Sequence, residues 1–321
     1  MRSPVPTPVL AAKTEAIETA AAAIRNGDLV IFPTETVYGL GGDATNAAAV
    51  ARIFHVKGRP ATNPLIVHVA DSESARSLVS AWPKSAADLA TAFWPGPLTL
   101  VLPSRGGVAD AVTAGGPTVA VRCPAHPVAL ELLRIAKCPI AAPSANRSGA
   151  LSPTQVKDLP DFSSTEVAWI LDGGPCPGGV ESTVVEVRAD GSLRLLRPGL
   201  INLRQLEAVV VRTITATGAV TDESERSPSP GLLRRHYAPR TALEIAETPD
   251  EAAFLKALYE KAGLRVTLWQ PRETADETAN TFYAELHRLD AGNYDRILAI
   301  LPPESEEWRA IRDRLTRAAA E

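Results

Sequence analysis

Two cations beside a glycine are the side chains in this sequence that best suit the binding of phosphate. Lys57 and Arg59 stand on either side of Gly58, and prolines at positions 60 and 64 restrict the shape of the segment. A lysine ammonium acts as a point charge and an arginine guanidinium as a planar fork, and both suit phosphate oxygens. A solvated basic turn is the commoner explanation for an isolated pair of this kind, so other motifs must decide.

A polar segment after a predicted buried strand is the second chemical signal. Leu29–Phe32 is short and apolar, and Pro33 stops the strand because proline has no N–H to donate. Hydroxyl, carboxyl and phenol side chains follow, together with glycines at positions 39, 41 and 42. A ligand in an open α/β sheet often binds where a strand ends in a glycine-rich loop. A hydrated surface turn is the alternative for this segment taken alone.

Polar residues also stand on later predicted strands. His68 lies on the strand Leu65–Val69, Arg122 ends a strand that begins at residue 118, and Arg197 ends a strand that begins at residue 193. An arginine at a strand end could bind a carboxylate, and successive glycines at positions 178 and 179 allow backbone N–H groups to bind an anion. A core histidine and an edge-strand ion pair are the structural alternatives for His68 and Arg122.

Helical and strand-like segments alternate along the chain and must position these residues. The helical patterns cover residues 14–26, 47–55, 72–80, 84–93, 127–136 and 203–211. A chain of 321 residues is long enough for two domains. We therefore expect an α/β fold with a first domain over residues 1–212, a linker over residues 213–240 and a second domain over residues 241–321.

The second domain has a simpler pattern. Thr248–Glu251 is a capping box with proline at the first helical position, and it predicts a helix to Ala262. Further helices over residues 281–291 and 308–320 alternate with strands over residues 266–268 and 297–301. The pattern predicts a small Rossmann-like α/β domain without a visible catalytic cluster.

Composition and charge exclude several classes of protein. Apolar residues make up 45% of the chain, and the net charge of −4 leaves no basic field for nucleic acid or a membrane surface. No early apolar run suits a signal peptide or a membrane span. Cys123, Cys138 and Cys176 form no C-x-x-C pair and suggest neither disulfides nor a zinc site. We expect a cytoplasmic protein with no metal ligands of its own, no membrane contact and no stable nucleic-acid binding.

Eight motifs follow one another in the first domain, and no single one is decisive. They are Pro33–Gly41, Lys57–Pro60, Asn63–His68, Trp94–Thr99, Val119–Arg122, Pro143–Asn146, Gly179–Thr183 and Leu196–Gly199. Their identity and order resemble the YrdC-type threonylcarbamoyl-AMP synthases in their long two-domain form. The resemblance covers residues 14–240 well and the remaining residues only in pattern, and chance agreement of eight ordered motifs is implausible.

The resemblance implies a YrdC-like twisted mixed sheet with helices around a concave site. It also implies synthesis of threonylcarbamoyl-AMP from L-threonine, bicarbonate and ATP, with release of pyrophosphate, for the modification of adenosine in tRNA. Mg²⁺ would accompany ATP, and the product would pass to a partner tRNA threonylcarbamoyl transferase. A reaction of this kind needs two anions held in place and their charge stabilised, rather than a covalent nucleophile.

Carried over by position, the resemblance assigns side chains to two substrates. The residues for threonine are Thr34, Thr36, His68, Arg122, Ala142 and Ser182, and which of the two threonine hydroxyls faces the ligand stays open. The residues for ATP are Lys57, Arg59, Asn63, Thr118, Ser144, Ser152, Arg197 and Tyr237. Lys57 and Arg59 would also act in catalysis as a clamp of positive charge.

The linker is expected to act as a lid. Ser227–Pro230 contains only serine and proline, as a tether would, but the charges and rings of Arg234–Tyr237 suit a nucleoside triphosphate. One departure from the family pattern falls in this segment. Leu232, Leu233 and Arg234 stand where the family usually has methionine, a basic residue and an aromatic residue, while Tyr237 keeps its place.

Two other functions remain as alternatives. A carbamoyl-adenylate-forming enzyme of the hydrogenase-maturation type would share the fold and use carbamoyl phosphate, but such chains are larger and carry added zinc-finger-like cysteines. An RNA-binding or ribosome-assembly module would need a basic stripe studded with aromatic residues. The net charge of −4 argues against that module.

Overall fold

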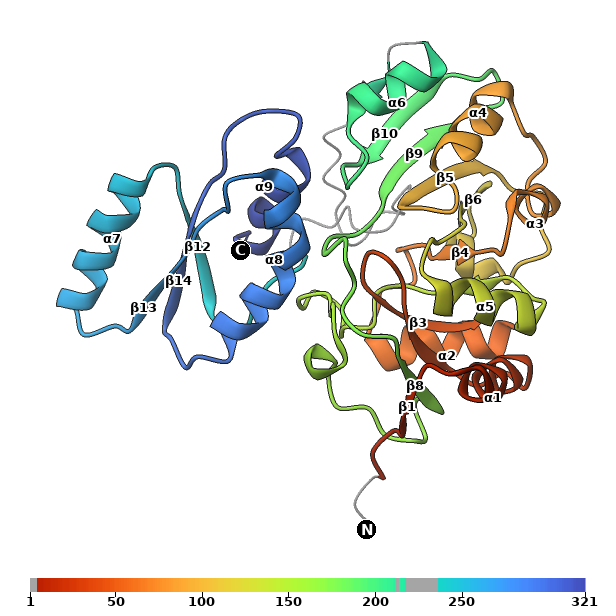
Figure 1. The fold of residues 1–321 in the computed structure, drawn as a ribbon, viewed down its shortest axis with the longest axis horizontal. Helices are drawn as coiled ribbons and strands as arrows, with labels where there is room; N and C mark the ends of the chain where they lie inside the picture. The colour runs from red at the N-terminus through yellow and green to blue at the C-terminus, as the bar shows by residue number, and fades with distance from the viewer. Residues whose placement is uncertain (1–4, 212–213, 217–235, 321) are drawn as a thin grey trace.

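The computed structural model describes residues 5–211, 214–216 and 236–320. This part of the chain folds into a larger and a smaller α/β unit that lie side by side (Figure 1). The tether at residues 227–230 and the departing residues 232–234 of the predicted linker lie outside the described residues, as does Arg235.

Eleven described strands form one mixed sheet in the order β1-β8-β2-β3-β7-β4-β6-β5-β9-β10-β11. The strands are β1 (Val9–Ala11), β2 (Val30–Pro33), β3 (Tyr38–Asp43), β4 (Ile66–His68), β5 (Leu98–Pro103), β6 (Thr118–Arg122), β7 (Ile140–Ala141), β8 (Trp169–Asp172), β9 (Thr183–Val187), β10 (Leu193–Arg197) and β11 (Thr215–Ala216). The helices are α1 (Thr14–Arg25), α2 (Ala47–Lys57), α3 (Ser72–Ser77), α4 (Lys84–Phe93), α5 (Pro127–Ala136) and α6 (Leu203–Val210). The expected mixed α/β sheet is confirmed, and β11 extends it past residue 212 into the range predicted as linker.

Strand β2 is buried on both faces and gives the site a rigid base. On one face Val30 and Phe32 pack in a cluster with Ile24 of α1, and this cluster also includes residues of α5. On the other face Ile31 packs in a cluster with Ile53 of α2. Successive side chains of a strand point to opposite faces, so a continuous apolar run suits a strand covered on both sides.

The glycine-rich segment after Pro33 is mostly a strand and not the loop that we expected. β3 pairs antiparallel with β2, and only residues 34–37 form the turn between them. A Cβ added to Gly41 would lie 2.5 Å from the Phe32 ring, and one added to Gly42 would lie 2.9 Å from Leu29. These glycines therefore allow close packing inside the sheet. From the sequence alone, a glycine that allows close packing cannot be distinguished from one that forms a turn.

Helix α2 brings the cation pair to the site. Asn46 caps its N-terminus by accepting the N–H groups of Ala48 and Ala49 at 3.0 and 3.2 Å. Gly58 ends the helix with φ of 62°, a left-handed conformation that glycine adopts without a steric cost. Lys57 is thus the last residue of a helix, and only Arg59 lies on the loop that follows it.

The smaller unit has a parallel sheet of three described strands in the order β12-β14-β13. Its elements are β12 (Ala242–Ala246), α7 (Pro249–Lys261), β13 (Val266–Trp269), α8 (Ala275–Asp290), β14 (Arg296–Ile300) and α9 (Arg309–Ala318). Strand β12 was not predicted. Helix α8 begins well before the predicted residue 281, because Thr274 and Glu277 form a capping box that the sequence analysis missed.

Helices α8 and α9 face the larger unit, and α7 lies on the far side of the small sheet (Figure 1). The two units share an apolar cluster, in which Val37, Leu151 and Val180 of the larger unit meet Phe282 and Tyr283 of α8. The small unit is therefore packed onto the larger one through its α8 and α9 side.

Within the described residues, no helix combines the length and the apolar character needed to cross a membrane.

Candidate functional site

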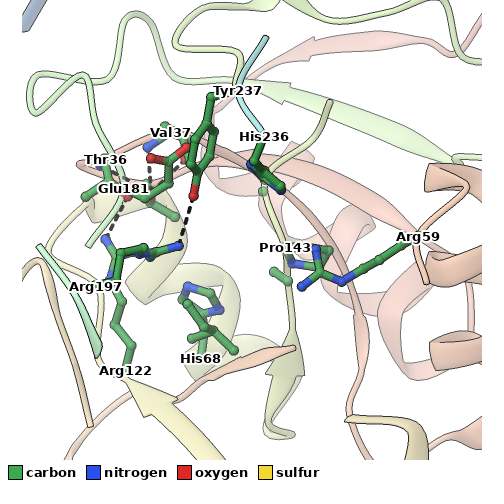
Figure 2. Close-up of a pocket in the computed structure, with 15 residues that line it drawn as sticks. Thr36, Val37, Arg59, His68, Arg122, Pro143, Glu181, Arg197, His236 and Tyr237 are labelled. Carbon is green, nitrogen blue, oxygen red and sulfur yellow. Dashed lines mark hydrogen bonds between the residues drawn. The ribbon is translucent and has the colours of Figure 1, made fainter. Parts of the chain in front are cut away.

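A cavity of about 540 Å³, its open mouth included, lies where several strand ends of the larger unit meet the C-terminal end of the predicted linker. It is lined by Thr34, Thr36, Val37, Gly39, Arg59, Ile66, His68, Arg122, Ala142, Pro143, Ser144, Glu181, Arg197, His236 and Tyr237. In Figure 2 the guanidinium of Arg59 approaches from the side opposite Arg122 and Arg197, with the His68 ring between them. Arginines on two opposite sides make this a site for negatively charged ligands.

Arg122 is held at the end of β6 by a carboxylate and a hydroxyl. Its Nη2 lies 2.7 Å from Oε1 of Glu35 and donates a hydrogen bond of 3.0 Å to Oγ1 of Thr36. The N–H of Ala125 donates to the other oxygen of Glu35 at 3.0 Å. A guanidinium oriented in this way, with a hydroxyl beside it, can bind a carboxylate in the cavity.

The two threonines of the β2–β3 turn have different roles. Oγ1 of Thr34 donates to the carbonyl of Val37 at 2.6 Å and accepts the N–H of Thr36 at 3.2 Å. The Thr34 hydroxyl therefore closes the turn, as a short polar side chain often does. The Thr36 hydroxyl lies 2.9 Å from that of Thr34 and accepts a hydrogen bond from Arg122.

His68 lies beside Arg122 because the strands β4 and β6 are parallel, with these two residues in register. Burial, followed by the nearby charge of Arg122, lowers the pKa of His68 to about 3. The ring is therefore neutral at physiological pH. It also packs edge-on against Phe32, with ring centroids 6.3 Å apart.

Arg59 is fixed by the loop that follows it. Its Nη2 donates to Oδ1 of Asn63 at 2.6 Å and to the carbonyl of Pro64 at 2.7 Å, and its Nε donates to the carbonyl of Asn63 at 2.9 Å. Burial lowers the pKa of Arg59 to about 10, so the guanidinium keeps its charge at neutral pH. Asn63 thus supports Arg59 and does not line the cavity.

Lys57 lies behind the cavity wall. Its Nζ donates to the carbonyls of Ser144, at 2.6 Å, and Asn146. Burial, followed by the nearby charges of Arg59 and Arg147, lowers the pKa of Lys57 well below its usual value. Through its two hydrogen bonds, Nζ of Lys57 holds the loop that presents Ser144 to the cavity.

Arg197 ends β10 and is tied to two segments. Its Nε and Nη2 donate to the carbonyl and the hydroxyl of Ser182, both at 3.1 Å, and its Nη1 donates to the hydroxyl of Tyr237 at 3.4 Å (Figure 2). The Ser182 hydroxyl lies 2.8 Å from that of Thr99. Arg197 thus joins the loop before β9 to the C-terminal end of the predicted linker.

His236 and Tyr237 come from that segment and form part of the cavity wall. Tyr237 is 1% exposed and has φ of 63°, which is uncommon for a residue other than glycine. Burial lowers the pKa of His236 to about 3, with the charge of Arg59 acting in the same direction, and burial raises the pKa of Tyr237. Both rings are therefore neutral at physiological pH.

Nine of the residues assigned from sequence lie in the wall of this one cavity. They are Thr34, Thr36, Arg59, His68, Arg122, Ala142, Ser144, Arg197 and Tyr237. Five others lie outside the lining: Lys57, Asn63, Thr118, Ser152 and Ser182. Four of these five form hydrogen bonds with wall residues: Lys57 with Ser144, Asn63 with Arg59, Ser182 with Arg197 and Ser152 with Glu181.

Sequence reasoning missed two carboxylates that organise the site. Glu35 stands between two assigned threonines and binds Arg122, and its position in that motif was the available signal. Glu181 precedes the assigned Ser182 and accepts a hydrogen bond of 2.5 Å from Ser152. Burial alone would raise the pKa of Glu181, but the charges of Arg314 and Arg197 outweigh it and lower this pKa to about 2.

Two family models match the chain. The Sua5_yciO_yrdC model, described as "Telomere recombination", matches residues 22–199. The Sua5_C model, described as "Threonylcarbamoyl-AMP synthase, C-terminal domain", matches residues 201–320. Together the two matches span most of the larger unit and all the described elements of the smaller one.

Similar proteins extend over nearly the whole chain. The threonylcarbamoyl-AMP synthase of Bacillus subtilis (strain 168) is 41% identical, with 94% of this chain and 92% of the relative covered. The synthase of Pyrococcus abyssi is 39% identical, with 94% of each covered. The crystal structure of P. abyssi Sua5 complexed with L-threonine matches with a TM-score of 0.90 and 38% identity, covering 99% of this chain and 98% of that one. The resemblance found in the motifs is confirmed, and the chain belongs to the Sua5/YciO/YrdC family, in the form that carries the Sua5 C-terminal domain.

Proposed function

We propose that this chain is a threonylcarbamoyl-AMP synthase, which joins L-threonine, bicarbonate and ATP and releases pyrophosphate for the threonylcarbamoyl modification of tRNA. The observation that carries this proposal is one cavity with Arg122 on one side and Arg59 on the other, and with Arg197 in its wall. Two groups of cations in one cavity suit a carboxylate and a chain of phosphates together. The full-length similarity to synthases of this name supports the same reaction.

L-Threonine is proposed to bind on the Arg122 side. The guanidinium of Arg122 suits the threonine carboxylate, and His68 and Ala142 lie in the adjoining wall. Thr36 is the better candidate for a ligand contact than Thr34, because the Thr34 hydroxyl already donates to the carbonyl of Val37 within the turn. Ser182 acts from behind the wall, through its hydrogen bonds with Arg197.

ATP is proposed to bind between Arg59, Arg197, Ser144 and Tyr237. The sequence assigned further residues to ATP, but Lys57, Asn63 and Ser152 bind protein groups and support the wall. Thr118 lies at the start of β6, away from the cavity lining, so a direct contact with ATP is the least supported of the assignments. Mg²⁺ would enter as the counter-ion of the ATP phosphates.

The reaction then follows from placing two anions together. Bicarbonate loses its hydroxyl group to give carbon dioxide, the amine of threonine forms a C–N bond to that carbon and gives up a proton, and a carbamate and water result. A carbamate oxygen attacks the α-phosphorus of ATP, the bond to the β-phosphate oxygen breaks, and pyrophosphate leaves. The chain orients the carbamate through Arg122 and stabilises the charge on the phosphates through Arg59 and Arg197. A covered cavity also protects the carbamate and the product from water.

The linker range 213–240 is proposed to act as a lid, with the small unit as its anchor. Tyr237 in the cavity wall supports this role, whereas Arg234 and Arg235 lie outside the described residues. Bound ATP and threonine should slow trypsin cleavage after these two arginines. Equal cleavage with and without substrates would show an ordinary tether. The proposed setting is the cytoplasm, with the product passing to a tRNA threonylcarbamoyl transferase.

The direct test of the function is release of pyrophosphate by the purified full-length chain. We expect pyrophosphate only when threonine, bicarbonate and Mg-ATP are all present, with each omitted in turn as a control. Formation of threonylcarbamoyl-AMP should be confirmed by mass spectrometry. Equal turnover with carbamoyl phosphate in the absence of threonine would instead support a carbamoyl-adenylate-forming enzyme.

A further inference from the structure

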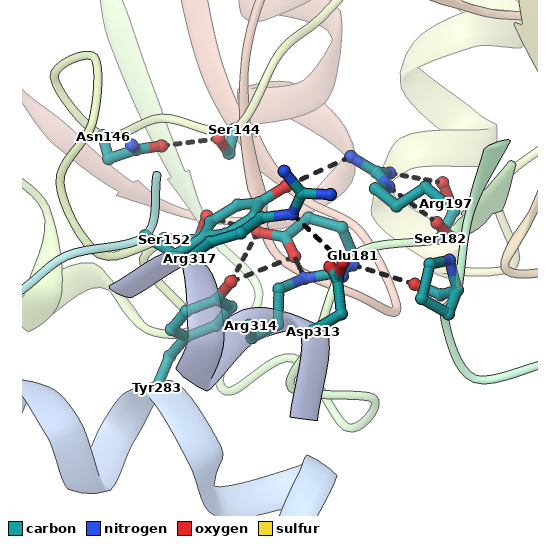
Figure 3. A network of polar contacts seen from close by, with 12 residues as sticks. Ser144, Asn146, Ser152, Glu181, Ser182, Arg197, Tyr283, Asp313, Arg314 and Arg317 are labelled. Carbon is teal, nitrogen blue, oxygen red and sulfur yellow. Dashed lines mark hydrogen bonds and ion pairs between the residues drawn. The ribbon is translucent and has the colours of Figure 1, made fainter. Parts of the chain in front are cut away.

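A buried carboxylate of the larger unit is held by both units at once. Oε1 of Glu181 accepts hydrogen bonds from Ser152 at 2.5 Å and from the Tyr283 hydroxyl at 2.9 Å. Oε2 accepts one of 2.8 Å from Nε of Arg314. Ser152 belongs to the larger unit, whereas Tyr283 and Arg314 lie on α8 and α9 of the smaller unit (Figure 3).

Arg314 makes contacts beyond its ion pair with Glu181. Its side chain is 0% exposed, its Nη2 donates to the carbonyl of Pro198 at 3.1 Å, and its guanidinium carbon lies 5.0 Å from the centre of the Tyr237 ring. Asp313 balances part of its charge at 2.6 Å. Arg314 therefore contacts three segments that carry residues of the cavity wall.

Each of these contacts lies next in sequence to Arg197 or to a group that binds it, or is such a group itself. Glu181 precedes Ser182, Pro198 follows Arg197, and Tyr237 accepts a hydrogen bond from Arg197. A displacement of about 1 Å in a reacting or binding group can slow an enzyme about 100-fold. We propose that Arg314 of the C-terminal domain is a positioning residue, which fixes Arg197 and Tyr237 through Glu181 and Pro198.

This role rests on the proposed function and gives the small domain a part in the reaction without a contact to substrate. The arrangement is not explained well by stability alone. A buried ion pair is often no more stabilising than apolar side chains of the same volume, because both charges lose their hydration. Hydrogen bonds to three partners, Glu181, Asp313 and Pro198, fix the geometry of this buried guanidinium in a way that an apolar contact cannot.

The test compares Arg314→Gln with Arg309→Gln in the full-length chain. Arg309 lies on the same helix and pairs with Glu306 at 3.3 Å, outside the cavity wall, so it controls for loss of a charge on α9. The readouts are kcat and KM for threonine-dependent pyrophosphate release, and the melting temperature. We expect Arg314→Gln to lower kcat/KM by about 100-fold at a temperature where it is folded, and Arg309→Gln to change it less than about threefold.

Tyr283→Phe provides a second variant in case Arg314→Gln does not fold. It removes the hydroxyl that donates to Glu181 and keeps the ring. We expect kcat/KM to fall by about 3- to 10-fold, with a melting temperature close to that of the wild type. In a Glu181→Gln background, Tyr283→Phe should have a smaller effect, because both changes disturb the same contact. Arg314→Lys should restore only part of the activity, since an ammonium cannot span Glu181, Asp313 and Pro198 together.

The outcomes separate the two proposals. Wild-type protein without threonine-dependent pyrophosphate release would overturn the proposed function and the positioning role with it. Active wild-type protein, with Arg314→Gln folded and as active as Arg309→Gln, would overturn only the positioning role. If Arg314→Gln does not fold, wild-type kinetics for Tyr283→Phe would overturn it.

Discussion

The hydroxyl of Tyr237 lies 3.4 Å from Nη1 of Arg197 and joins the C-terminal end of the predicted linker to the end of β10 (Figure 2). Tyr237→Phe removes this hydrogen bond and keeps the buried ring. A hydrogen bond to a charged group contributes about 1.5–3 kcal/mol, but the length of this one places it at or below the lower end. We expect kcat/KM for ATP to fall by about 3- to 10-fold, with little change in melting temperature.

Tyr237→Ala is the informative comparison for the same position. The ring packs with Tyr283 in the apolar cluster shared by the two units, and Arg314 lies over it. Removal of the ring leaves a cavity between the units, so the melting temperature should fall. The activity should also be lower than that of Tyr237→Phe. Activity of Tyr237→Phe as low as that of Tyr237→Ala would mean that the hydroxyl, rather than the packing, carries the effect.

Arg59→Ala tests the cation on the opposite wall. Loss of one donor that stabilises developing charge typically slows an enzyme by about 10²–10³-fold, and we expect a fall of that size in kcat. Binding of threonine, measured by calorimetry, should change much less, because Arg122 lies on another wall. Arg52→Ala is the control, since this partly exposed arginine of α2 pairs with Asp28 outside the cavity wall. Wild-type kcat for Arg59→Ala would show that this cation has no part in the reaction.

Two buried histidines should make the protein less stable in mild acid. The pKa values of His68 and His236 are lowered to about 3 in the folded protein, against about 6.5 in an unfolded chain. Between these values the unfolded state binds more protons, so the free energy of unfolding falls as pH decreases from about 6.5 towards 3. In this range each histidine lowers the free energy of unfolding by up to about 1.4 kcal/mol for each unit by which the pH decreases.

Denaturant unfolding between pH 7 and pH 4 measures this dependence. His236→Gln removes one titrating group and should flatten the curve relative to the wild type. His55→Gln serves as the control for replacing a histidine, because His55 is an exposed residue of α2. Curves of the same slope for wild type and His236→Gln would contradict the assignment of a buried neutral ring.

The sequence predicted which residues end strands, but not which strands are neighbours. Arg122 and His68 were both assigned as binding residues, and their contact follows from the parallel pairing of β4 with β6 in register. Reasoning from the local sequence misread the glycines at positions 41 and 42 as loop residues. A glycine that allows close packing, as Gly41 does against Phe32, cannot be distinguished in sequence from a glycine that forms a turn.

The carboxylate at the centre of the polar network could not be recognised from local sequence. Glu181 stands next to glycines and hydroxyl residues, and nothing nearby indicates that it is buried. Its cationic partner Arg314 is 133 residues away, on a helix of the other unit. Only the packing of α9 against the larger unit brings the two charges together, and this contact between domains has no motif of its own.

The final prediction concerns Gly179, where the loop before β9 meets α8. Its φ is 69°, and a Cβ added there would lie 1.9 Å from the carbonyl oxygen of Ala279. Such a contact forces one backbone to move, so Gly179→Ala should separate the loop from α8 and displace Glu181. We expect a lower melting temperature together with a fall in kcat/KM of about 100-fold.

Gly115→Ala is a matched control for the backbone conformation of Gly179. Gly115 also has φ of 69°, but an added Cβ would meet nothing within 4 Å. It therefore reports the cost of placing alanine in a left-handed conformation, about 1–2 kcal/mol, without the clash. Differential scanning calorimetry and pyrophosphate release on both variants separate the two effects. If Gly179→Ala loses no more stability and activity than Gly115→Ala, then close packing of the loop against α8 does not hold the site.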